Sequence, residues 1–248
     1  MTFLLLILTD NHCLCYNSDM KNSKTTDHKN SDKTMILASA SPRRIEMFRK
    51  NGFDPKVIPS DYEEKIPDFM TPAETVMFLA LQKGLSVYRT LCCSDLSKAD
   101  SGTFEEKFSA RDSIDPNEYM IISADTIVVD YTEGRILGKP KSEKEAYEML
   151  SSLSGRSHHV LTGVCLISRN NDQFIKCFYE SSEVFFKDIP VDELYAYVKT
   201  DEPYDKAGGY AIQETFGKYT DHIIGDLDNI IGFPFQRFLK EANITPIK

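Results

Sequence analysis

Residues 119–130 read Tyr-Met-Ile-Ile-Ser-Ala-Asp-Thr-Ile-Val-Val-Asp, within a chain of 248 residues. Most of these side chains are apolar and several are β-branched, which predicts a strand buried on both faces. Such a strand belongs near the centre of a sheet, so we expect the rest of the fold to be arranged around it. Asp125 is the one carboxylate in the interior of this run.

Strand-like and helix-like segments alternate around this stretch from residue 35 onward. Further strands are predicted at residues 35–39, 159–168, 174–187 and 219–224. Helices are predicted at residues 42–51, 71–88, 142–155 and 190–199, with a short last one after Pro234. Thr71 with Glu74 and Ser142 with Glu145 form capping boxes, in which a hydroxyl and a glutamate satisfy free N–H groups of a helix. The mixed connections predict an α/β fold with a mixed sheet and flanking helices.

Two segments stand outside this pattern. Residues 17–34 are polar, and we expect all of residues 1–34 to be a disordered N-terminal extension ahead of one domain at 35–248. The apolar run Phe3–Leu8 is too short to span a bilayer, and it lacks the basic start and small-residue cleavage site of a signal peptide. Residues 91–118 have no clear period and are predicted to be a surface insertion.

Composition narrows the class of protein. The net charge of −9 makes nucleic acid an unfavourable partner, although a local basic cluster can still bind a small anion. The six cysteines show neither zinc-site spacing nor the framework of a small secreted protein. Free thiols fit a reducing compartment, so we expect a cytoplasmic protein that does not associate with a membrane.

Asp125 is the strongest single indication of function. A carboxylate inside an apolar strand is costly unless it meets a cation, a metal ion or hydrogen-bond donors. A strand-end aspartate that turns toward water is the simpler interpretation. We favour a functional one, in which Asp125 holds a metal ion or accepts a proton from water.

A basic motif lies where the first predicted strand meets a helix. Ser41, with Pro42 after it, is the expected N-cap, and free backbone N–H groups favour an anion there. Arg43 and Arg44 in the first turn oppose the helix dipole, a conflict that a bound polyphosphate would remove. Two solvated arginines beside a well-capped helix remain the alternative.

Three further charged positions could serve the same site. Lys83 falls on the apolar stripe of its helix, so it either reaches the edge of the helix or points into a pocket. Glu64 follows a short strand and could supply a metal-binding oxygen. Lys139, in a tight turn after the Asp125 strand, could reach the same phosphates, and a solvated turn lysine is equally compatible with the pattern.

A glycine-containing loop, 205–213, is expected to lead into a strand. Gly208 and Gly209 would let the backbone approach a ligand closely. Gln213 offers both a donor and an acceptor, which suits recognition of a base edge. Three residues of a later loop are candidates to support the site, namely Asp226, Asp228 and Asn229.

Taken in order, these segments resemble the Maf family of nucleotide pyrophosphatases. The matching pieces are Ser39-Ala40-Ser41-Pro42-Arg43-Arg44, Ala124-Asp125-Thr126, Gly138-Lys139-Pro140, Ser154-Gly155 with His159-Val160 and Thr162, Asp201-Glu202-Pro203, Lys206-Ala207-Gly208-Gly209-Tyr210-Ala211-Ile212-Gln213, and Gly225-Asp226 with Asn229, Gly232 and Pro234. Each piece is short, but the ordered set is specific and extends from about residue 35 to the C-terminus.

The resemblance implies an α/β fold shared with inosine triphosphatases, with two lobes around a cleft. It also implies metal-dependent hydrolysis of a nucleoside triphosphate to the monophosphate and pyrophosphate, which clears non-standard nucleotides. Asp125 is then the proton acceptor and binds Mg²⁺ or Mn²⁺ together with Glu64. Lys83 and Lys139 complete the catalytic set.

Substrate binding is assigned to a second group of positions, namely Ser41, Arg43, Arg44, Thr126, Lys206 and Gln213. Within the family, Arg43, Thr126 and Gln213 match the type that acts on dTTP and UTP, and modified pyrimidine triphosphates are a reasonable extension. Family members are often dimers, so a homodimer is a further expectation.

Two other functions remain open. The chain could bind nucleotides without cleaving them and regulate cell division. It could also be a phosphatase with Asp125 as a covalent nucleophile, but that class typically has a second aspartate two residues on, where this chain has Ile127.

Overall fold

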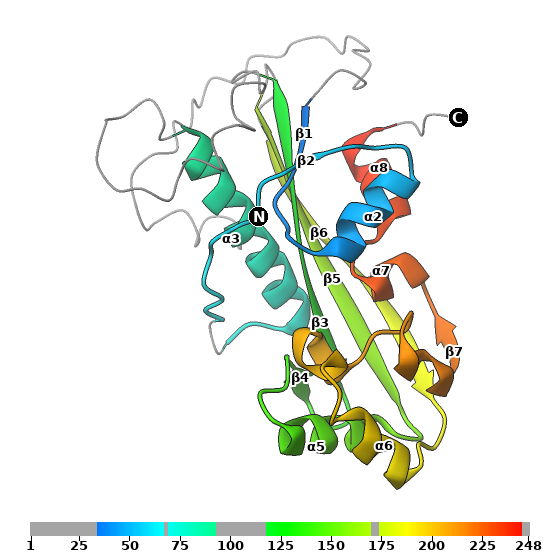
Figure 1. The fold of residues 1–248 in the computed structure, drawn as a ribbon. Coiled ribbons are helices and arrows are strands. Elements are labelled where there is room, and N and C mark those ends of the chain that lie inside the picture. The colour runs from blue at the N-terminus through cyan, green and yellow to red at the C-terminus, as the bar shows by residue number, and fades with distance from the viewer. Residues whose placement is uncertain (1–33, 67–68, 93–117, 170–173, 245–248) are drawn as a thin grey trace.

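The computed structural model describes residues 34–66, 69–92, 118–169 and 174–244. They form a mixed sheet of seven strands in the order β2-β1-β3-β5-β6-β7, with β4 paired to β3 (Figure 1). The strands are β1 (Thr34–Leu37), β2 (Lys56–Val57), β3 (Tyr119–Asp130), β4 (Arg135–Leu137), β5 (Ser157–Arg169), β6 (Phe174–Phe186) and β7 (Thr220–Ile224). The predicted α/β fold with a mixed sheet is therefore confirmed.

Helices flank this sheet. The α-helices are α2 (Pro42–Lys50), α3 (Pro72–Cys92), α5 (Glu143–Leu153), α6 (Val191–Tyr197), α7 (Leu227–Ile231) and α8 (Phe235–Ala242). The 3₁₀ helices are η3 (Glu202–Asp205), η4 (Ala207–Gly209) and η5 (Thr215–Tyr219). In the described parts of the chain, no helix is both long enough and apolar enough to cross a membrane.

Strand β3 has the bounds predicted for the central strand, and eleven of its twelve residues are buried. It pairs with β1 in parallel and with β5 in antiparallel register, with Asp125 opposite Gly163. Because side chains alternate along a strand, Asp125 faces the sheet side covered by α3 and Thr126 faces the opposite side.

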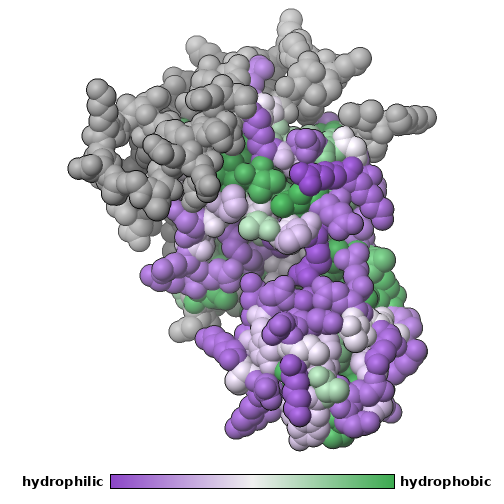
Figure 2. Space-filling model, in the orientation of Figure 1, coloured by the Kyte–Doolittle hydropathy of each residue, from purple (hydrophilic) through white to green (hydrophobic). Residues whose placement is uncertain are grey.

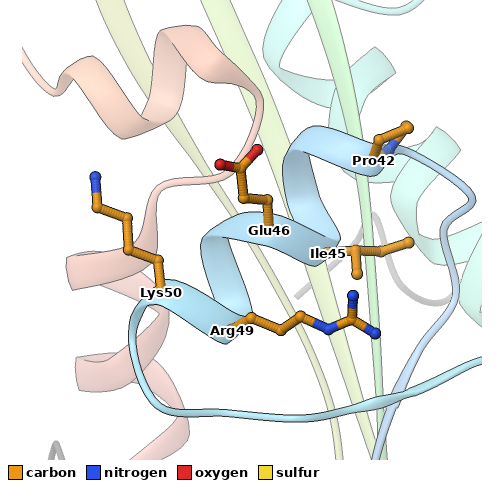
Figure 3. A pocket seen from close by; sticks show the side chains of 5 residues that line it. All are labelled: Pro42, Ile45, Glu46, Arg49 and Lys50. Carbon is orange, nitrogen blue, oxygen red and sulfur yellow. The ribbon is translucent and has the colours of Figure 1, made fainter.

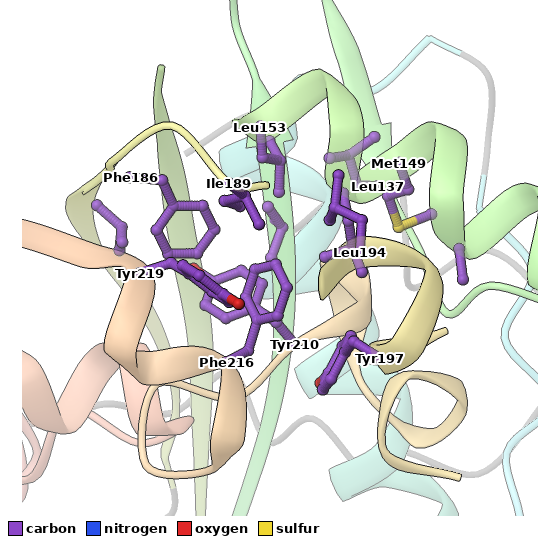
Figure 4. Packing of buried hydrophobic residues seen from close by; sticks show 14 of the residues in the cluster. Leu137, Met149, Leu153, Phe186, Ile189, Leu194, Tyr197, Tyr210, Phe216 and Tyr219 are labelled. Atoms are coloured by element: carbon purple, nitrogen blue, oxygen red, sulfur yellow. The ribbon is translucent and has the colours of Figure 1, made fainter. Parts of the chain in front are cut away.

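The apolar core changes along β3. Met120, Ile122 and Ala124 belong to a cluster with α2 and α8, which includes Phe48, Phe233, Phe235 and Phe238. Val128 belongs to another cluster at the far end of the sheet, among α5, α6 and η5 (Figure 4). Asp125 and Thr126 lie between these two cores, and the division matches the two lobes that the resemblance implies.

The two capping boxes differ in detail. In α3 the Thr71 Oγ1 atom accepts from Glu74 N at 3.3 Å, and Glu74 Oε2 accepts from Thr71 N at 2.9 Å. In α5 the Ser142 Oγ atom accepts from Glu145 N, whereas the Glu145 carboxylate accepts from Lys141 N. Both helices therefore begin where the sequence predicts.

Several details of the sequence prediction are wrong. Helix α3 continues to Cys92, past the predicted end at Tyr88, so the expected insertion begins inside a helix. Val191 is 58% exposed rather than inward, because only Leu194 and Tyr197 of the short helix α6 are buried. The glycine loop leads into η5 and not directly into a strand.

Some expectations fall on other parts of the chain. Residues 1–33 of the expected extension, residues 93–117 of the expected insertion and the predicted turn at 170–172 lie outside the described residues.

The surface at the end of the molecule formed by α5 and α6 consists mostly of hydrophilic side chains in the view of Figure 2.

Candidate active site

The candidate site lies at an interruption along one edge of β3. Strand β1 ends its pairing with β3 at Leu37, opposite Ile122, and β4 begins its pairing at Leu137, opposite Val128. Residues 123–127 therefore have no strand partner on this edge in the described part of the sheet. Asp125 is at the middle of the interruption.

Segments that follow the two short strands reach this interruption from opposite ends. The Ser39–Arg44 motif follows β1, and Lys139 follows β4. The glycine loop contacts the segment after β4, since Gly208 N donates to Gly138 O at 3.0 Å. A Cβ at Gly208 would lie 2.8 Å from the Val128 side chain, so only glycine allows this approach, and its φ is +72°.

Lys83 connects the two predicted acidic residues. Its Nζ atom donates to Asp125 Oδ1 and, at 2.8 Å, to Glu64 Oε1. The side chains of Asp125 and Lys83 are 10% and 17% exposed, whereas that of Glu64 is 51% exposed. Lys83 thus points inward to the site, which decides between the two orientations left open by the sequence.

Burial and charge act in opposite directions on the two carboxyls. Burial raises the pKa of Asp125, and the nearby Lys83 only partly offsets it. Burial would also raise the pKa of Glu64, but Lys83, Lys139 and Arg44 together hold that pKa below its ordinary value. Five charged positions that were predicted separately therefore influence one another's charge at the same place.

Close packing of α3 on the sheet brings Lys83 to Asp125. A Cβ at Gly163 would lie 2.3 Å from Val76 O, and one at Gly84 would lie 2.7 Å from Ser123 Oγ. The buried Ser123 Oγ atom also donates to Ala80 O at 2.7 Å. Two glycines and one serine thus fix how closely the helix approaches β3 and β5.

Arg44 is held by protein acceptors. Its Nε atom donates to Gly232 O at 2.8 Å, and Nη1 donates to Ala124 O at 2.9 Å and to Ser39 Oγ at 3.2 Å. Its Nη2 atom donates to Thr126 Oγ1 at 3.0 Å. Four of five N–H groups are thereby occupied by protein acceptors, which leaves one for a ligand.

Arg43 and Lys206 share a partner that the sequence analysis missed. Glu214 lies 3.6 Å from Arg43 Nη1 and 3.0 Å from Lys206 Nζ. Lys206 also donates to Asp205 Oδ1 and to Glu202 O, so its three N–H groups are occupied, and it is 6% exposed. Burial would lower the pKa of Lys206, but its two carboxylate partners raise it. 

The remaining predicted binding residues, Ser41, Lys139 and Gln213, have polar side-chain atoms that are available to a ligand. Ser41 has the extended backbone of an N-cap, but its side chain caps no N–H group of α2. Lys139 and Gln213 are exposed, and neither forms a hydrogen bond or ion pair with the residues that the structure describes.

The two carboxylates fit a divalent cation in part. Glu64 and Asp125 converge on a single cation, the Lys83 ammonium, which shows that both can reach one positive charge. Over the described residues there is no group of three or more His, Cys, Asp or Glu side chains that could hold a metal ion. Mg²⁺ is commonly bound by one or two carboxylates plus phosphate and water, so the donor set suits an ion that arrives with a nucleotide.

A separate pocket lies on the outer face of α2. It has a volume of about 560 Å³ and is lined by Pro42, Ile45, Glu46, Arg49 and Lys50 (Figure 3). These positions share one helix face, whereas Arg44, Met47 and Phe48 point to the protein interior. This pocket is therefore not the space around Asp125.

The site also contains residues to which the sequence analysis gave no role of their own. Ser39 and Thr162 stand within the quoted motifs, and the structure places their hydroxyls on Arg44 and Thr126. Glu214 carries no local signal, because a single glutamate after a loop is ordinary surface composition. Asn229, predicted only as support, is fully buried next to Thr162.

Comparison with known proteins shows which family the chain belongs to. The model of the Maf-like protein family matches residues 34–243. The dTTP/UTP pyrophosphatase of Bacillus thuringiensis subsp. konkukian is 39% identical over 207 residues, 84% of this chain and 93% of the relative. The dTTP/UTP pyrophosphatase of Caldicellulosiruptor bescii is 38% identical over 205 residues, 83% of this chain and 91% of the relative.

Two further proteins match this chain over only part of their own length. The probable bifunctional dTTP/UTP pyrophosphatase/methyltransferase protein of Homo sapiens is 38% identical over 216 residues, 84% of this chain and 31% of that protein. The Ham1 protein of Staphylococcus aureus superposes with a TM-score of 0.35 at 15% identity, over 62% of this chain and 72% of that one, a likeness too slight to support a conclusion. The family match over most of the described residues and the full-length relatives show that this chain belongs to the Maf family.

Proposed function

We propose that this protein hydrolyses dTTP and UTP to the nucleoside monophosphate and pyrophosphate, in the cytoplasm, and thereby clears non-standard pyrimidine nucleotides. Two relatives that match nearly their whole length bear the name dTTP/UTP pyrophosphatase. The three positions that distinguish this type, Arg43, Thr126 and Gln213, have the matching residues here.

The observation that carries the proposal is the contact of Lys83 with both Asp125 and Glu64. An ammonium shared by two carboxylates at an interruption in the sheet is costly as a purely structural feature, since Lys83 and Asp125 lose most of their hydration. The same three groups are well suited to a phosphate chain that carries a divalent cation. Lys83 can bind a phosphate oxygen, and both carboxylates then become available.

Asp125 and Glu64 would hold the cation. A Mg²⁺ or Mn²⁺ ion bound there supplies charge that offsets the negative charge of the phosphates. Lys83, Lys139 and Arg43 bind phosphate oxygens, and the single unoccupied N–H group of Arg44 adds one donor. Lys206 holds Glu214, which in turn holds Arg43, and does not itself contact the phosphates.

Asp125 accepts the proton in the chemical step. A water molecule attacks the α-phosphorus, its oxygen forms the new P–O bond, and its proton passes to an Asp125 carboxylate oxygen. The bond from the α-phosphorus to the bridging oxygen breaks, and pyrophosphate leaves with that oxygen. A raised pKa, caused by burial, makes Asp125 a better proton acceptor than an exposed aspartate.

The base is selected at the side of the site formed by α2 and the glycine loop. Glu214 fixes Arg43 beside the loop that ends in Gln213, so two of the three specificity positions are held together. Gln213 is exposed and its amide can both donate and accept, as the edge of uracil or thymine requires. Ser41 contributes an uncapped hydroxyl at the start of α2.

Neither alternative function is favoured by an observation. A regulator that only binds nucleotide would not need a buried carboxylate in contact with a lysine. A covalent phosphatase would need a second carboxylate near the position of Ile127, which is buried and apolar.

The test is pyrophosphate release from a panel of nucleoside triphosphates, with Mg²⁺ or Mn²⁺ and an EDTA control. Metal-dependent release that favours dTTP and UTP is expected. Release that favours a purine would overturn the specificity assignment but keep the chemistry. Binding of nucleotide with no pyrophosphate release would overturn the proposed reaction.

A further inference from the structure

Arg44, Thr126, Thr162 and Asn229 form a row of hydrogen bonds that leads from the site into the sheet. Arg44 Nη2 donates to Thr126 Oγ1 at 3.0 Å, and Thr126 Oγ1 lies 2.9 Å from Thr162 Oγ1. Thr162 Oγ1 donates to the backbone oxygen of Asn229 at 3.0 Å. The two threonines are opposite one another on β3 and β5.

Counting protons fixes the direction of this row. A threonine hydroxyl has one proton to donate, and Thr162 uses its proton on Asn229 O. Thr126 accepts from Arg44 and donates its own proton to the nearer of its two acceptors, which is Thr162 Oγ1 at 2.9 Å rather than Gly232 O at 3.5 Å. Each donor points away from the guanidinium, so the Thr126 hydroxyl has no proton left for a nucleotide.

The far end of the row is anchored in the sheet. Asn229 is fully buried, and its Nδ2 atom donates to Val160 O at 2.9 Å and to Ser182 Oγ at 3.0 Å. Ser182 in turn bonds both the N–H and the carbonyl of Asp226, each at 2.9 Å. The start of α7 is thus fixed to β5 and β6 by side chains that solvent does not reach.

The near end of the row controls the backbone around Asp125. The Arg44 guanidinium holds the carbonyl of Ala124, the residue before Asp125, and the hydroxyl of Thr126, the residue after it. Its Nε atom is held by Gly232, at the end of α7. Arg44 therefore connects both neighbours of Asp125 to the element that Asn229 anchors.

We propose that Thr162 is a positioning residue, which holds Arg44 and thereby the Asp125 backbone through Thr126 and Asn229. The proposal rests on the proposed function, because it assigns what Thr162 does for that reaction. It also gives Thr126 an indirect part in the site, since the hydroxyl of Thr126 is already used within the protein.

Loss of the Thr162 hydroxyl has a definite consequence. In Thr162→Val, the Thr126 proton needs another acceptor, and Gly232 O is already 3.5 Å away. That oxygen already accepts from Arg44 Nε, and a shorter bond from Thr126 to it would move Thr126 Oγ1 relative to Arg44 Nη2. Arg44 then shifts, and the backbone at Asp125 moves with it.

The experiment compares steady-state kinetics of wild type, Thr162→Val and Thr162→Ser with dTTP and Mg²⁺. Serine keeps the hydroxyl, whereas valine keeps the shape. Ser168→Ala is the matched control, because Ser168 is buried on the same strand and its Oγ atom has no hydrogen-bond partner among the described residues. This control tests whether the loss of any buried hydroxyl group on β5 lowers kcat.

For Thr162→Val we expect kcat to fall about 10- to 100-fold, as for small misplacements of catalytic groups, with KM for dTTP within about threefold. Thr162→Ser and Ser168→Ala should keep kcat within about threefold of wild type. Equal kcat in Thr162→Val and Ser168→Ala, or an equal loss in Thr162→Ser, would overturn the role of Thr162 alone. A wild type that cleaves no triphosphate would overturn the proposed function as well.

A crystal structure of Thr162→Val gives a second readout that does not depend on activity. Separation of Arg44 Nη1 from Ala124 O is expected, and an unchanged contact would contradict the proposal. Should the valine variant not fold, Ser182→Ala releases Asn229 from its other side. Ser182→Ala should lower kcat several-fold and leave KM unchanged. An unchanged kcat would contradict the proposal that these hydrogen bonds position Arg44.

Discussion

At the scale of single residues, Arg44 shows how sequence and structure can suggest different roles. Its place at a helix start predicts a phosphate ligand, but four of its N–H groups bind protein acceptors. A planar guanidinium with five donors can meet several acceptors in fixed directions, which an ammonium cannot do. We therefore assign Arg44 mainly to holding the backbone beside Asp125.

Arg44→Lys tests this assignment. Lysine keeps the charge but cannot reach Gly232, Ala124 and Thr126 together, so we expect kcat to fall about 100-fold. Arg49→Lys is the control, because Arg49 is an exposed residue of the same helix with one weak ion pair. The measurement is kcat of both variants from steady-state kinetics. Equal kcat in Arg44→Lys and Arg49→Lys would contradict the assignment.

His158 makes a separate prediction, on stability. It is buried against Tyr210, with Asp130 and His159 as its charged or titratable neighbours, and burial lowers its pKa from 6.5 to about 3. The unfolded chain therefore binds a proton that the folded chain does not, so stability is full above pH 6.5 and falls as the pH drops toward 3. At pH 5 the loss is about 2 kcal/mol.

His158→Gln removes this group at every pH. Urea unfolding at pH 7 and pH 5 should show that the variant loses about 2 kcal/mol less than wild type between the two values. The variant is expected to be less stable than wild type at pH 7, because it loses the Tyr210 contact. The same dependence on pH in both proteins would contradict the prediction.

The residues that the sequence marked most clearly were those whose polarity does not suit their position. Asp125 inside an apolar strand and Lys83 on an apolar helix face are both costly unless they meet a partner, and here they meet one another. Lys206 carries no such contradiction, and one of its three bonds to protein groups is to Glu214, which folding brings near. Contacts of that kind are not visible in a local pattern.

At the scale of secondary structure, the seating of α3 on the sheet decides whether Lys83 reaches Asp125. Gly163 stands opposite Asp125 on the next strand and has the backbone of α3 directly above it. Backbone atoms cannot move aside as a flexible side chain can, so any side chain at this position displaces the helix.

Gly163→Ala should therefore be strongly destabilising. The added Cβ would lie 2.3 Å from Val76 O, and we expect a loss of about 3 kcal/mol in the free energy of unfolding. Gly138→Ala is the matched control, since a Cβ there meets no atom within 4 Å, and it should change stability by less than about 0.5 kcal/mol. Denaturant unfolding of the two variants compares them directly, and similar stabilities would argue against tight seating of α3.

Elements with a strong local signal were predicted well. The strand at 119–130 and the helix starts at Pro72 and Glu143 follow from composition and capping, which are local properties. The segment after Gly209 was predicted poorly, because its 3₁₀ turns pack on the core through Phe216 and Tyr219 and have no regular period. The interruption along β3 depends on where β1 and β4 end, which no local pattern contains.

At the scale of the whole molecule, we expect the fold not to depend on a metal ion. The two carboxylates that would hold one are both paired with Lys83, and the apolar cores lie on either side of the site. Metal and substrate are therefore expected to act on the reaction and not on folding.

Removal of divalent cations tests this independence. With EDTA, pyrophosphate release should stop while the thermal midpoint stays within about 2 °C of the untreated protein, since no structural metal is lost. Excess Mg²⁺ should restore the activity. A large fall of the midpoint in EDTA would show that the metal stabilises the fold, in conflict with the role given to Lys83.

The central claim is that Asp125 accepts a proton during cleavage of a nucleoside triphosphate at its α-phosphorus. The most direct test measures dTMP and pyrophosphate released from dTTP with Mg²⁺ by wild type and by Asp125→Asn, after circular dichroism has shown that both are folded. The account predicts equal amounts of the two products from wild type and a rate about 1000-fold lower from the variant. Comparable rates from the two proteins, or release of dTDP and inorganic phosphate by wild type, would contradict it.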